Sequence, residues 1–176
     1  DDWDLIRPPD AYKIDSNDFG HIIYSKIDEG IQSLYYINNI YENYTNPIRL
    51  DITQPRQYFS DQQILVDASG NIHIAYIKVQ YSNDDEYRWV DDNINYKVIG
   101  NQGDLLDDKI IDYPTLYHAQ SLRVRLDKNG RTHMVFRASD EYDETGRNEN
   151  YNLYYTSNKS DSFLSYNQIN SNYLRF

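Results

Sequence analysis

Three histidines in this chain recur with the same chemical neighbours. His21, His73 and His133 each lie six residues after an aspartate and three residues before an aromatic side chain. Imidazole titrates near neutral pH and ligates metal ions, so a histidine beside a carboxylate could transfer a proton or bind a metal. These histidines are therefore the first residues to consider as catalytic groups or ligands.

The repetition itself favours a structural role for these residues. The segment 66–76 reads as strand, tight turn and strand, and the same pattern surrounds all three histidines. Equivalent positions in separate units should lie too far apart to share one ion, so we expect each ring to donate to a backbone carbonyl of the adjacent turn. Asp15, Asp67 and Asp127 are likewise expected to serve turns, because Asp bonds nearby backbone amides.

The turns of the three units are not identical in sequence. Gly70 and Gly130 each follow the aspartate by three residues, at a place where a turn requires a positive φ. In the first unit Asp18 stands at this place and the glycine is Gly20. We therefore expect the first turn to have a different shape.

The elements around these residues predict an all-β fold. Short apolar segments alternate with turn signals, and no segment has convincing helical periodicity. Each unit of about 50–60 residues holds four expected strands, which is typical of a β-propeller blade. We expect one propeller segment over 1–176, with three four-stranded antiparallel blades at about 10–54, 62–113 and 121–169. Three blades are too few to close a ring, so the chain is either a partial propeller or one completed by another chain.

The units resemble the blade repeats of sialidase-like, Asp-box-related β-propellers. Those repeats carry an aspartate and a glycine in the first hairpin turn, followed by an aromatic residue, as Asp67, Gly70 and Tyr76 do here. The resemblance implies a ring fold. The Ser and Trp of a full Asp-box are absent, and no residues match the arginine cluster or nucleophile of a sialidase active site.

Composition limits the classes of partner. The 176 residues include 28 acidic and 17 basic side chains, giving a net charge of −11 that disfavours nucleic acid and anionic lipid. No apolar run is long enough to insert into a membrane. The absence of cysteine excludes disulfides and thiolate metal sites. The missing initiator Met suggests a processed chain or an excised fragment, and we expect an extracellular or cell-envelope location.

Binding is expected where the units differ from each other. The connections 81–93 and 139–150 and the links 53–61 and 114–120 should gather at one end of the blades. They contain aromatic and cationic side chains that suit a glycan, since rings stack on sugars and guanidinium groups bond hydroxyls. The candidate ligand-binding residues are Tyr87, Arg88, Trp89, Tyr117, His118, Tyr142 and Arg147.

The sequence leaves the function open between two classes. The first is a non-catalytic binding or scaffold module, glycan-binding or purely structural, that belongs to a larger propeller or self-associates. The alternative is a carbohydrate-active enzyme, either a glycoside hydrolase or a polysaccharide lyase that would use Tyr117 and His118 with Arg88 or Arg147. No cofactor is expected other than Ca²⁺, for which Asp140, Asp143 and Glu144 are weak candidate ligands.

Overall fold

The computed structural model describes residues 11–39, 46–81, 89–111, 113, 116–139, 151–158 and 166–169, without the side chains of 89–91 and 117. The described residues form twelve strands and no helix, which confirms the predicted all-β class. No apolar helix that could cross a membrane occurs among them.

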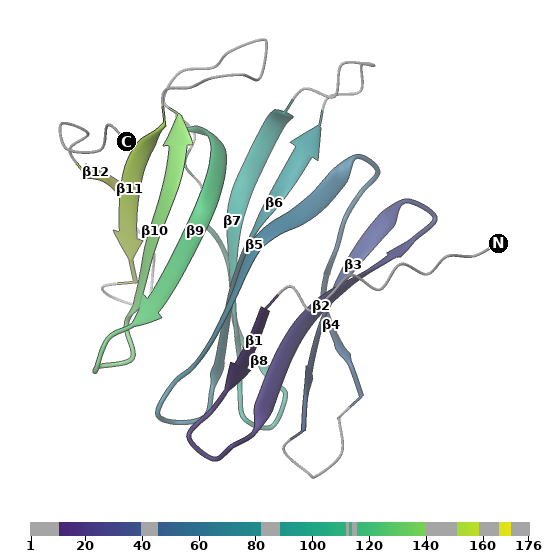
Figure 1. The fold of residues 1–176 in the computed structure, drawn as a ribbon, viewed down its shortest axis with the longest axis vertical. Helices are drawn as coiled ribbons and strands as arrows, with labels where there is room; N and C mark the ends of the chain where they lie inside the picture. Colours follow the sequence, from purple (N-terminus) through teal and green to yellow (C-terminus); the bar gives the residue numbers. More distant parts are fainter. Residues whose placement is uncertain are drawn as a thin grey trace.

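The strands form three four-stranded antiparallel sheets, each made of strands consecutive in the chain (Figure 1). Sheet 1 contains β1 (Ala11–Ile14), β2 (Gly20–Asp28), β3 (Ile31–Asn38) and β4 (Ile48–Ile52). Sheet 2 contains β5 (Gln57–Val66), β6 (Ile72–Tyr81), β7 (Trp89–Ile99) and β8 (Leu105–Ile111). Sheet 3 contains β9 (Tyr117–Leu126), β10 (Thr132–Ser139), β11 (Asn152–Ser157) and β12 (Tyr166–Ile169).

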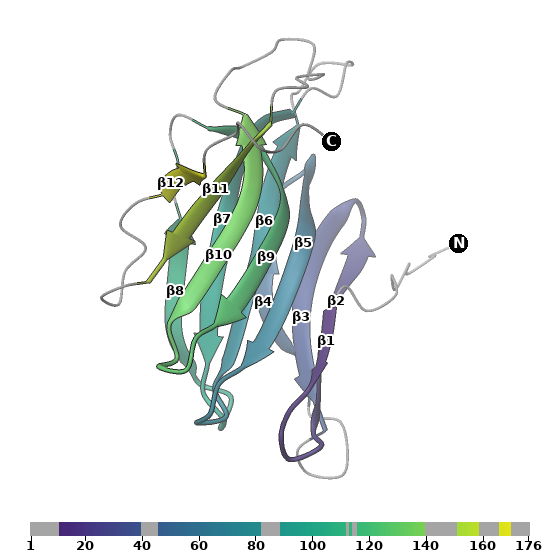
Figure 2. The same cartoon turned by 60° about the vertical axis from the view of Figure 1, so that its left-hand side comes forward.

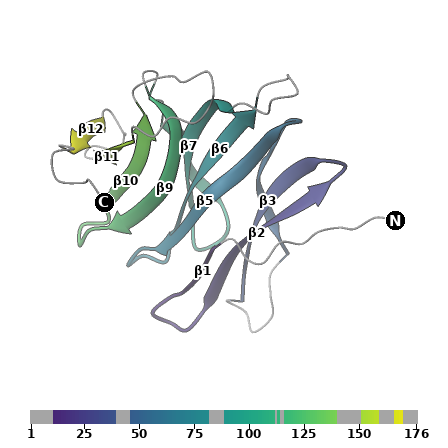
Figure 3. The ribbon, with the colours of Figure 1, turned by 45° about the horizontal axis from the view of Figure 1, so that its top comes forward.

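Sheet 2 lies between the other two, and both of its faces are covered (Figures 1 and 3). Along β6, Ile74 and Tyr76 belong to the core shared with sheet 1, whereas Ala75 and Ile77 belong to the core shared with sheet 3. Because successive strand residues point to opposite faces, a strand covered on both sides is apolar throughout. In the sequence, neither face of 72–77 is strongly polar, which predicts cover on both sides, and the two cores confirm it.

Two apolar cores hold the sheets together. The core between sheets 1 and 2 is formed by Ile23, Leu34, Tyr36, Phe59, Ile64, Ile72, Ile74, Tyr76 and Ile99. The larger core between sheets 2 and 3 includes Ile94, Tyr96, Ile111, Tyr113, Leu122, Val124, Met134, Phe136 and Tyr154. Burial of apolar area in these two layers is the main stabilising contribution to the stack.

The outer faces of sheets 1 and 3 are less buried. Burial alternates along β2 and β10, with every second residue buried against sheet 2. We call the side of sheet 1 that carries Tyr12, Ile22, Tyr24, Lys26 and Tyr35 its outer face. Tyr12 is 72% exposed there.

Sheets 2 and 3 begin earlier than the expected blades at 62 and 121. Both first strands are interrupted by a bulge, after which pairing continues along the long second strand. Asp61 and Ser121 adopt positive φ values of 51° and 57° at these interruptions. A bulge inserts an extra residue and bends the strand, so a sequence pattern of strict alternation ends there.

The strand ends define two ends of the stack, visible in Figure 2. The β1–β2, β5–β6 and β9–β10 hairpin turns lie together at one, which we call the turn end (Figures 1 and 2). The opposite end, where β6 and β10 finish and β7 and β9 begin, we call the loop end. The strands that flank the long connections end and begin there, whereas most of the connecting residues lie outside the described part of the chain.

Candidate functional site

Each repeated histidine bonds two side chains of its own sheet. The Nδ1 atoms of His21, His73 and His133 lie 2.8, 2.5 and 2.7 Å from a tyrosine hydroxyl on the third strand. The three tyrosines are Tyr36, Tyr96 and Tyr155. The expectation of a backbone carbonyl partner was therefore wrong, because a tyrosine on the neighbouring strand reaches the ring.

The second ring nitrogen faces the aspartate that precedes each histidine. The Nε2–Oδ2 distances are 3.4, 3.3 and 3.4 Å in the three units. An ionised carboxylate only accepts, so Nε2–H donates to it, and in the neutral imidazole Nδ1 then accepts from the tyrosine hydroxyl. We call this constellation the Asp–His–Tyr fastening; it joins the first hairpin to the third strand within each sheet.

The fastening aspartates also organise their turns. In the second unit, Asp67 Oδ1 accepts from the backbone N–H groups of Ser69 and Asn71 at 2.8 and 2.9 Å. Burial alone would raise the pKa of Asp67, but hydrogen bonds from Asn71, His73 and Ser69 outweigh it and hold the pKa below its ordinary value. Asp67 is therefore ionised at neutral pH and serves as an acceptor.

The first turn has the same geometry as the others, contrary to the sequence expectation. Asp15 Oδ1 accepts from the N–H groups of Asn17 and Phe19 at 2.8 and 3.0 Å. Asp18 adopts a φ of 63°, close to the 80° of Gly70 and the 75° of Gly130. Aspartate tolerates the left-handed conformation better than most residues, so the turn keeps its shape without glycine.

The three fastenings stay separate, each within one sheet. Hollows of about 390 and 530 Å³ lie between neighbouring turns at the turn end. Asp15, His21 and Ser69 contribute to the first, and Asp67 and Asp127 to the second. No group of three or more His, Asp or Glu residues suited to one metal ion occurs in the described part of the chain.

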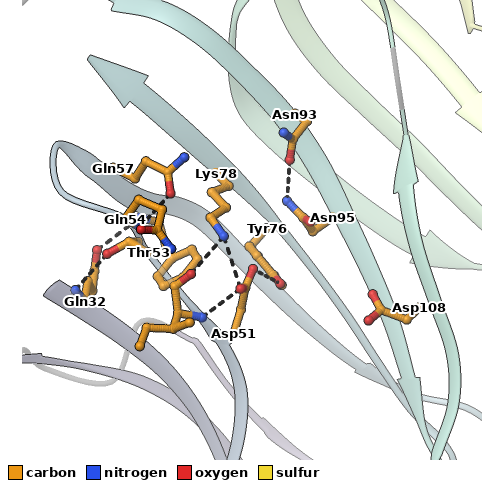
Figure 4. A network of polar contacts seen from close by, with 12 residues as sticks. Gln32, Asp51, Thr53, Gln54, Gln57, Tyr76, Lys78, Asn93, Asn95 and Asp108 are labelled. Atoms are coloured by element: carbon orange, nitrogen blue, oxygen red, sulfur yellow. Dashed lines mark hydrogen bonds and ion pairs between the residues drawn. The ribbon is translucent and has the colours of Figure 1, made fainter. Parts of the chain in front are cut away.

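A polar contact crosses from sheet 1 to sheet 2, as Figure 4 shows. Asp51 on β4 accepts from the Tyr76 hydroxyl at 2.8 Å and from Lys78 Nζ at 3.1 Å, both on β6. Lys78 also donates to the carbonyl of Ile52 at 2.9 Å. Burial and the neighbouring Asp51 raise the pKa of Tyr76, so its hydroxyl stays protonated and donates. One carboxylate thus joins two adjacent sheets.

Hydrogen bonds of a buried glutamine reinforce this junction. Gln32 on β3 receives a bond from the N–H of Thr53 at its backbone carbonyl, and its own N–H donates to Thr53 Oγ1 at 2.8 Å. Its side-chain carbonyl accepts from the N–H of Phe59 on β5 at 3.0 Å. The link between the sheets is therefore fixed at several buried polar atoms.

Asp92 has a similar role between sheets 2 and 3. Its two carboxylate oxygens accept from the Tyr113 hydroxyl and from the N–H of Ala119, each at 2.8 Å. Tyr96 adds a second bond between the sheets, since its hydroxyl lies 2.8 Å from Thr132 Oγ1. Burial raises the pKa of Tyr96 to about 12.

Most of the predicted ligand-binding residues lie outside the described residues. Those are Tyr87, Arg88, Tyr142 and Arg147, together with the Ca²⁺ candidates Asp140, Asp143 and Glu144. Trp89 begins β7 and Tyr117 begins β9, and their side chains are not described. His118 is 2% exposed with a φ of 58°, so a ligand would reach its ring only after its surroundings opened.

The strand bounds bring Trp89 and Tyr117 to the same end of the stack. Trp89 pairs with Tyr81 at the end of β6, and Tyr117 pairs with Ser139 at the end of β10. The bond from Ala119 to Asp92 holds the first residues of β9 against those of β7. The described backbone therefore brings the first residues of β7 and β9 to one end of the stack, as the predicted binding surface requires.

An arginine-rich surface was not anticipated from the sequence. We call the side of sheet 3 that carries Arg123, Arg125, Val135, Arg137 and Tyr155 its outer face. All three arginines are exposed, and they alternate with residues buried against sheet 2. Residues 121–138 contain five basic side chains and one acidic one, although the whole chain carries −11. The alternation of arginine and aliphatic residues in 122–125 is the signal that could have located this surface.

No protein-family model matches the chain, and no curated protein sequence matches it significantly. The function is therefore inferred from the geometry of the described residues.

Proposed function

We propose that this chain is a non-catalytic binding or scaffold module built from β-propeller blades. One observation carries the proposal: sheet 2 is covered on both faces by sheets of the same strand order, with all first hairpin turns at one end. Radial stacking of four-stranded antiparallel sheets is the arrangement of propeller blades. The three-fold recurrence of the Asp turn supports the resemblance to sialidase-like propellers at the level of architecture alone.

The ring would be completed by sheets beyond the three described here. Two sources were expected from the sequence, namely further repeat units or a second copy of the chain. The outer face of sheet 3 carries three arginines, whereas the outer face of sheet 1 has mixed charge, with Lys26 and Arg49 beside Asp28 and Glu29. Of the two sources we propose further units, with the chain alone remaining a monomer. Light scattering should therefore give a mass near 21.0 kDa for the chain alone.

The ligand class that we propose is glycan, bound at the loop end. Trp89 and Tyr117 begin neighbouring strands there, and Asp92 fixes the two strand starts relative to each other. Aromatic residues held on a rigid sheet provide stacking surfaces at low entropic cost. An extracellular or cell-envelope location belongs to the same proposal.

A glycan array followed by calorimetry on the best ligand tests this assignment. Trp89→Ala and Tyr117→Ala should each weaken binding by roughly tenfold or more, the usual effect of removing an aromatic anchor. Tyr12→Ala is the matched control, because Tyr12 is 72% exposed on the outer face of sheet 1 and should leave binding unchanged. Binding that survives both loop-end substitutions would remove this surface from consideration.

A further inference from the structure

The four strands of sheet 3 contain three arginines and no acidic residue. Arg123 and Arg125 lie on β9 and Arg137 lies on β10, and all three are exposed on the outer face of sheet 3. The strands of sheets 1 and 2, in contrast, include aspartates. A chain with a net charge of −11 thus carries one basic surface without acidic residues, on its last described sheet.

The three arginines are neighbours on this surface. Arg123 is paired opposite Val135, and Arg137 follows Val135 by two residues on the same face. Arg125 follows Arg123 by two residues, a spacing of about 7 Å along a strand. This spacing is shorter than the Debye length at physiological salt, roughly 8 Å, so the charges repel one another and favour an anionic partner.

The contacts that these side chains make leave their charge without a counterion. Nη1 of Arg123 and of Arg125 each donates to the backbone carbonyl of the preceding residue, at 2.8 and 2.7 Å. Arg137 lies over the ring of Tyr151, 5.0 Å from its centroid. A guanidinium has five N–H donors, so most of them remain for another acceptor. None of the three arginines takes part in an ion pair within the described part of the chain.

The outer face of sheet 3 corresponds to faces that sheets 1 and 2 bury. Ser25, Ile77 and Arg137 each stand four positions after the repeated histidine, and Ser25 and Ile77 are 0% exposed. Leu65 holds in sheet 2 the register position of Arg125, and it packs against the core between sheets 2 and 3. In sheets 1 and 2 this kind of face is therefore covered by the sheet that follows.

The first strand of the following sheet lies on such a face. β5 contacts β1, β2 and β3 of sheet 1, and β9 contacts β5, β6 and β7 of sheet 2. Ile64 on β5 and Val124 on β9 hold equivalent register positions, and each is buried in the core toward the preceding sheet. The first strand of a further sheet would by the same stacking lie over β9, β10 and β11, where the arginines are.

Arginines require a different first strand from the apolar ones of β5 and β9. Covering a guanidinium with apolar side chains removes its hydration without supplying an ion partner, which is unfavourable. Carboxylates on that strand would instead accept bidentate hydrogen bonds from the guanidinium forks. We propose that the outer face of sheet 3 docks a further four-stranded repeat sheet whose first strand presents Asp or Glu to Arg123, Arg125 and Arg137. This docking rests on the proposed stack of blades and names the chemistry of the unit that follows.

A polyanionic polymer would account for the arginines but not for the rest of the face. Leu153 on β11 is paired opposite Ile169 on β12, which is 41% exposed. In sheet 2 the equivalent pair, Ile94 and Ile111, is buried in the core shared with sheet 3. A polymer of charged units would leave the apolar pair of sheet 3 in water, whereas a packed sheet would bury it.

A variant of the full chain supplies an acidic first strand as a probe. On the outer face of sheet 1, Tyr12 and Ile14 hold the register positions of Ile64 and Val66, and they are 72% and 58% exposed. Tyr12→Glu with Ile14→Glu therefore gives the acidic probe, and Tyr12→Lys with Ile14→Lys gives its matched basic control. Both probes also carry three substitutions that prevent docking onto themselves, namely Arg123→Gln, Arg125→Gln and Arg137→Gln.

Surface plasmon resonance measures binding of the natural chain to each immobilised probe. We expect the acidic probe to bind at least tenfold more tightly than the basic one, since a single charged hydrogen bond has an effect of that size. Binding to the acidic probe should weaken as the salt concentration rises. Arg123→Gln, Arg125→Gln and Arg137→Gln in the soluble chain should each weaken it, whereas Lys128→Gln, at the exposed β9–β10 turn, removes the same charge and should leave it unchanged.

Three outcomes would overturn the proposal. They are equal binding by the acidic and basic probes, no binding by a folded acidic probe, or binding that survives all three arginine substitutions in the soluble chain. A natural chain that binds dextran sulfate through the arginines but not the acidic probe would likewise overturn it and assign the face to a polyanion.

Circular dichroism confirms that the probes are folded, and Tyr12→Glu alone, with the same three arginine substitutions, is the second acidic probe if the double substitution unfolds the chain. Glycan binding at the loop end is measured separately. Failure of the docking test therefore leaves the glycan assignment intact, and failure of the glycan test leaves the docking proposal intact.

Discussion

At the level of single residues, one hydrogen-bonding constellation occurs in three different environments. The histidine side chain of the Asp–His–Tyr fastening is 1% exposed in sheet 1, 8% in sheet 2 and 34% in sheet 3. Its bond lengths are nearly the same in all three. Because water can replace a lost partner only at an exposed site, the three copies should differ in their contribution to stability.

Tyr96→Phe tests this difference. The hydroxyl of Tyr96 bonds both His73 and Thr132 in a fully buried site, so its loss leaves two polar atoms without a partner. We expect the free energy of unfolding to fall by about 1–3 kcal/mol. Tyr155→Phe, at the partly exposed copy, should cost less than about 1 kcal/mol. Urea denaturation followed by circular dichroism measures both, and equal losses would contradict the role of burial.

The sequence revealed only half of each fastening. Asp67 and His73 lie six residues apart on one hairpin, so their spacing is fixed by local structure. Tyr96 follows on a separate strand, after a connection whose length differs between units, and therefore shows no constant spacing. Its role depends on the register between β6 and β7, which aligns Ala75 with Tyr96.

At the level of strands and turns, the repeated first hairpin keeps its shape despite a change of residue. Asp18 N–H bonds the Asp15 carbonyl at 3.3 Å, as Gly130 bonds Asp127 at 3.0 Å. The hydrogen bonds that Asp15 accepts hold the turn closed, although a positive φ is sterically unfavourable for Asp18. The shape of this turn is therefore set by the aspartate that begins it.

Asp18→Gly should stabilise the protein by roughly 0.5–1 kcal/mol, because glycine adopts a positive φ without steric cost. Gly130→Ala is the matched reverse change: its φ is 75° and no atom within 4 Å would clash with an added Cβ. We expect it to destabilise by about 1 kcal/mol through backbone strain alone. Thermal unfolding of both variants measures the effects, and a destabilising Asp18→Gly would show that the aspartate side chain has a further role.

The start of β7 shows why strand bounds are harder to predict than strand existence. The acidic residues 91–92 read as part of a polar connection, yet the strand begins at Trp89 and pairs with the last residues of β6. Asp92 is accommodated because Tyr113 and Ala119 donate to its carboxylate. These donors come later in the chain, at the passage into sheet 3, and are not visible in the local sequence.

At the level of the whole molecule, the contacts between sheets are specified by matched residues on facing positions. Asp51 on β4 accepts a hydrogen bond from Tyr76 on β6. Ile111 holds in sheet 2 the register position that Asp51 holds in sheet 1, and it lies in one core with Phe136 of sheet 3. If such matched residues determine how the sheets pack, replacing both members of a polar pair by apolar residues should destabilise the protein less than replacing one member.

Asp51→Ile alone should lower the free energy of unfolding by about 2 kcal/mol, because the buried Tyr76 hydroxyl loses its acceptor. Adding Tyr76→Phe should restore at least half of that loss, since the unsatisfied hydroxyl is removed and Lys78 keeps its bond to the Ile52 carbonyl. Asp107→Ala, which breaks the more exposed pair with Lys109, should cost less than about 1 kcal/mol. A double variant no more stable than Asp51→Ile in urea unfolding would show that the two residues are not coupled.

The sequence by itself determined the class of the fold and the period of the repeat. It did so because turn chemistry and two-residue alternation are local properties, readable around Asp67, Gly70 and His73. It also determined that the middle unit is covered on both faces, since Ile74 and Ala75 are both apolar.

Only the tertiary structure decided which residues meet across the sheets. The tyrosine of each fastening, the carboxylate beneath Tyr76 and the arginines on one face of sheet 3 depend on strand register and on the stacking of sheets. Contacts between residues distant in the chain arise from the packing of whole elements, and one residue of register shift would exchange the two faces of a strand.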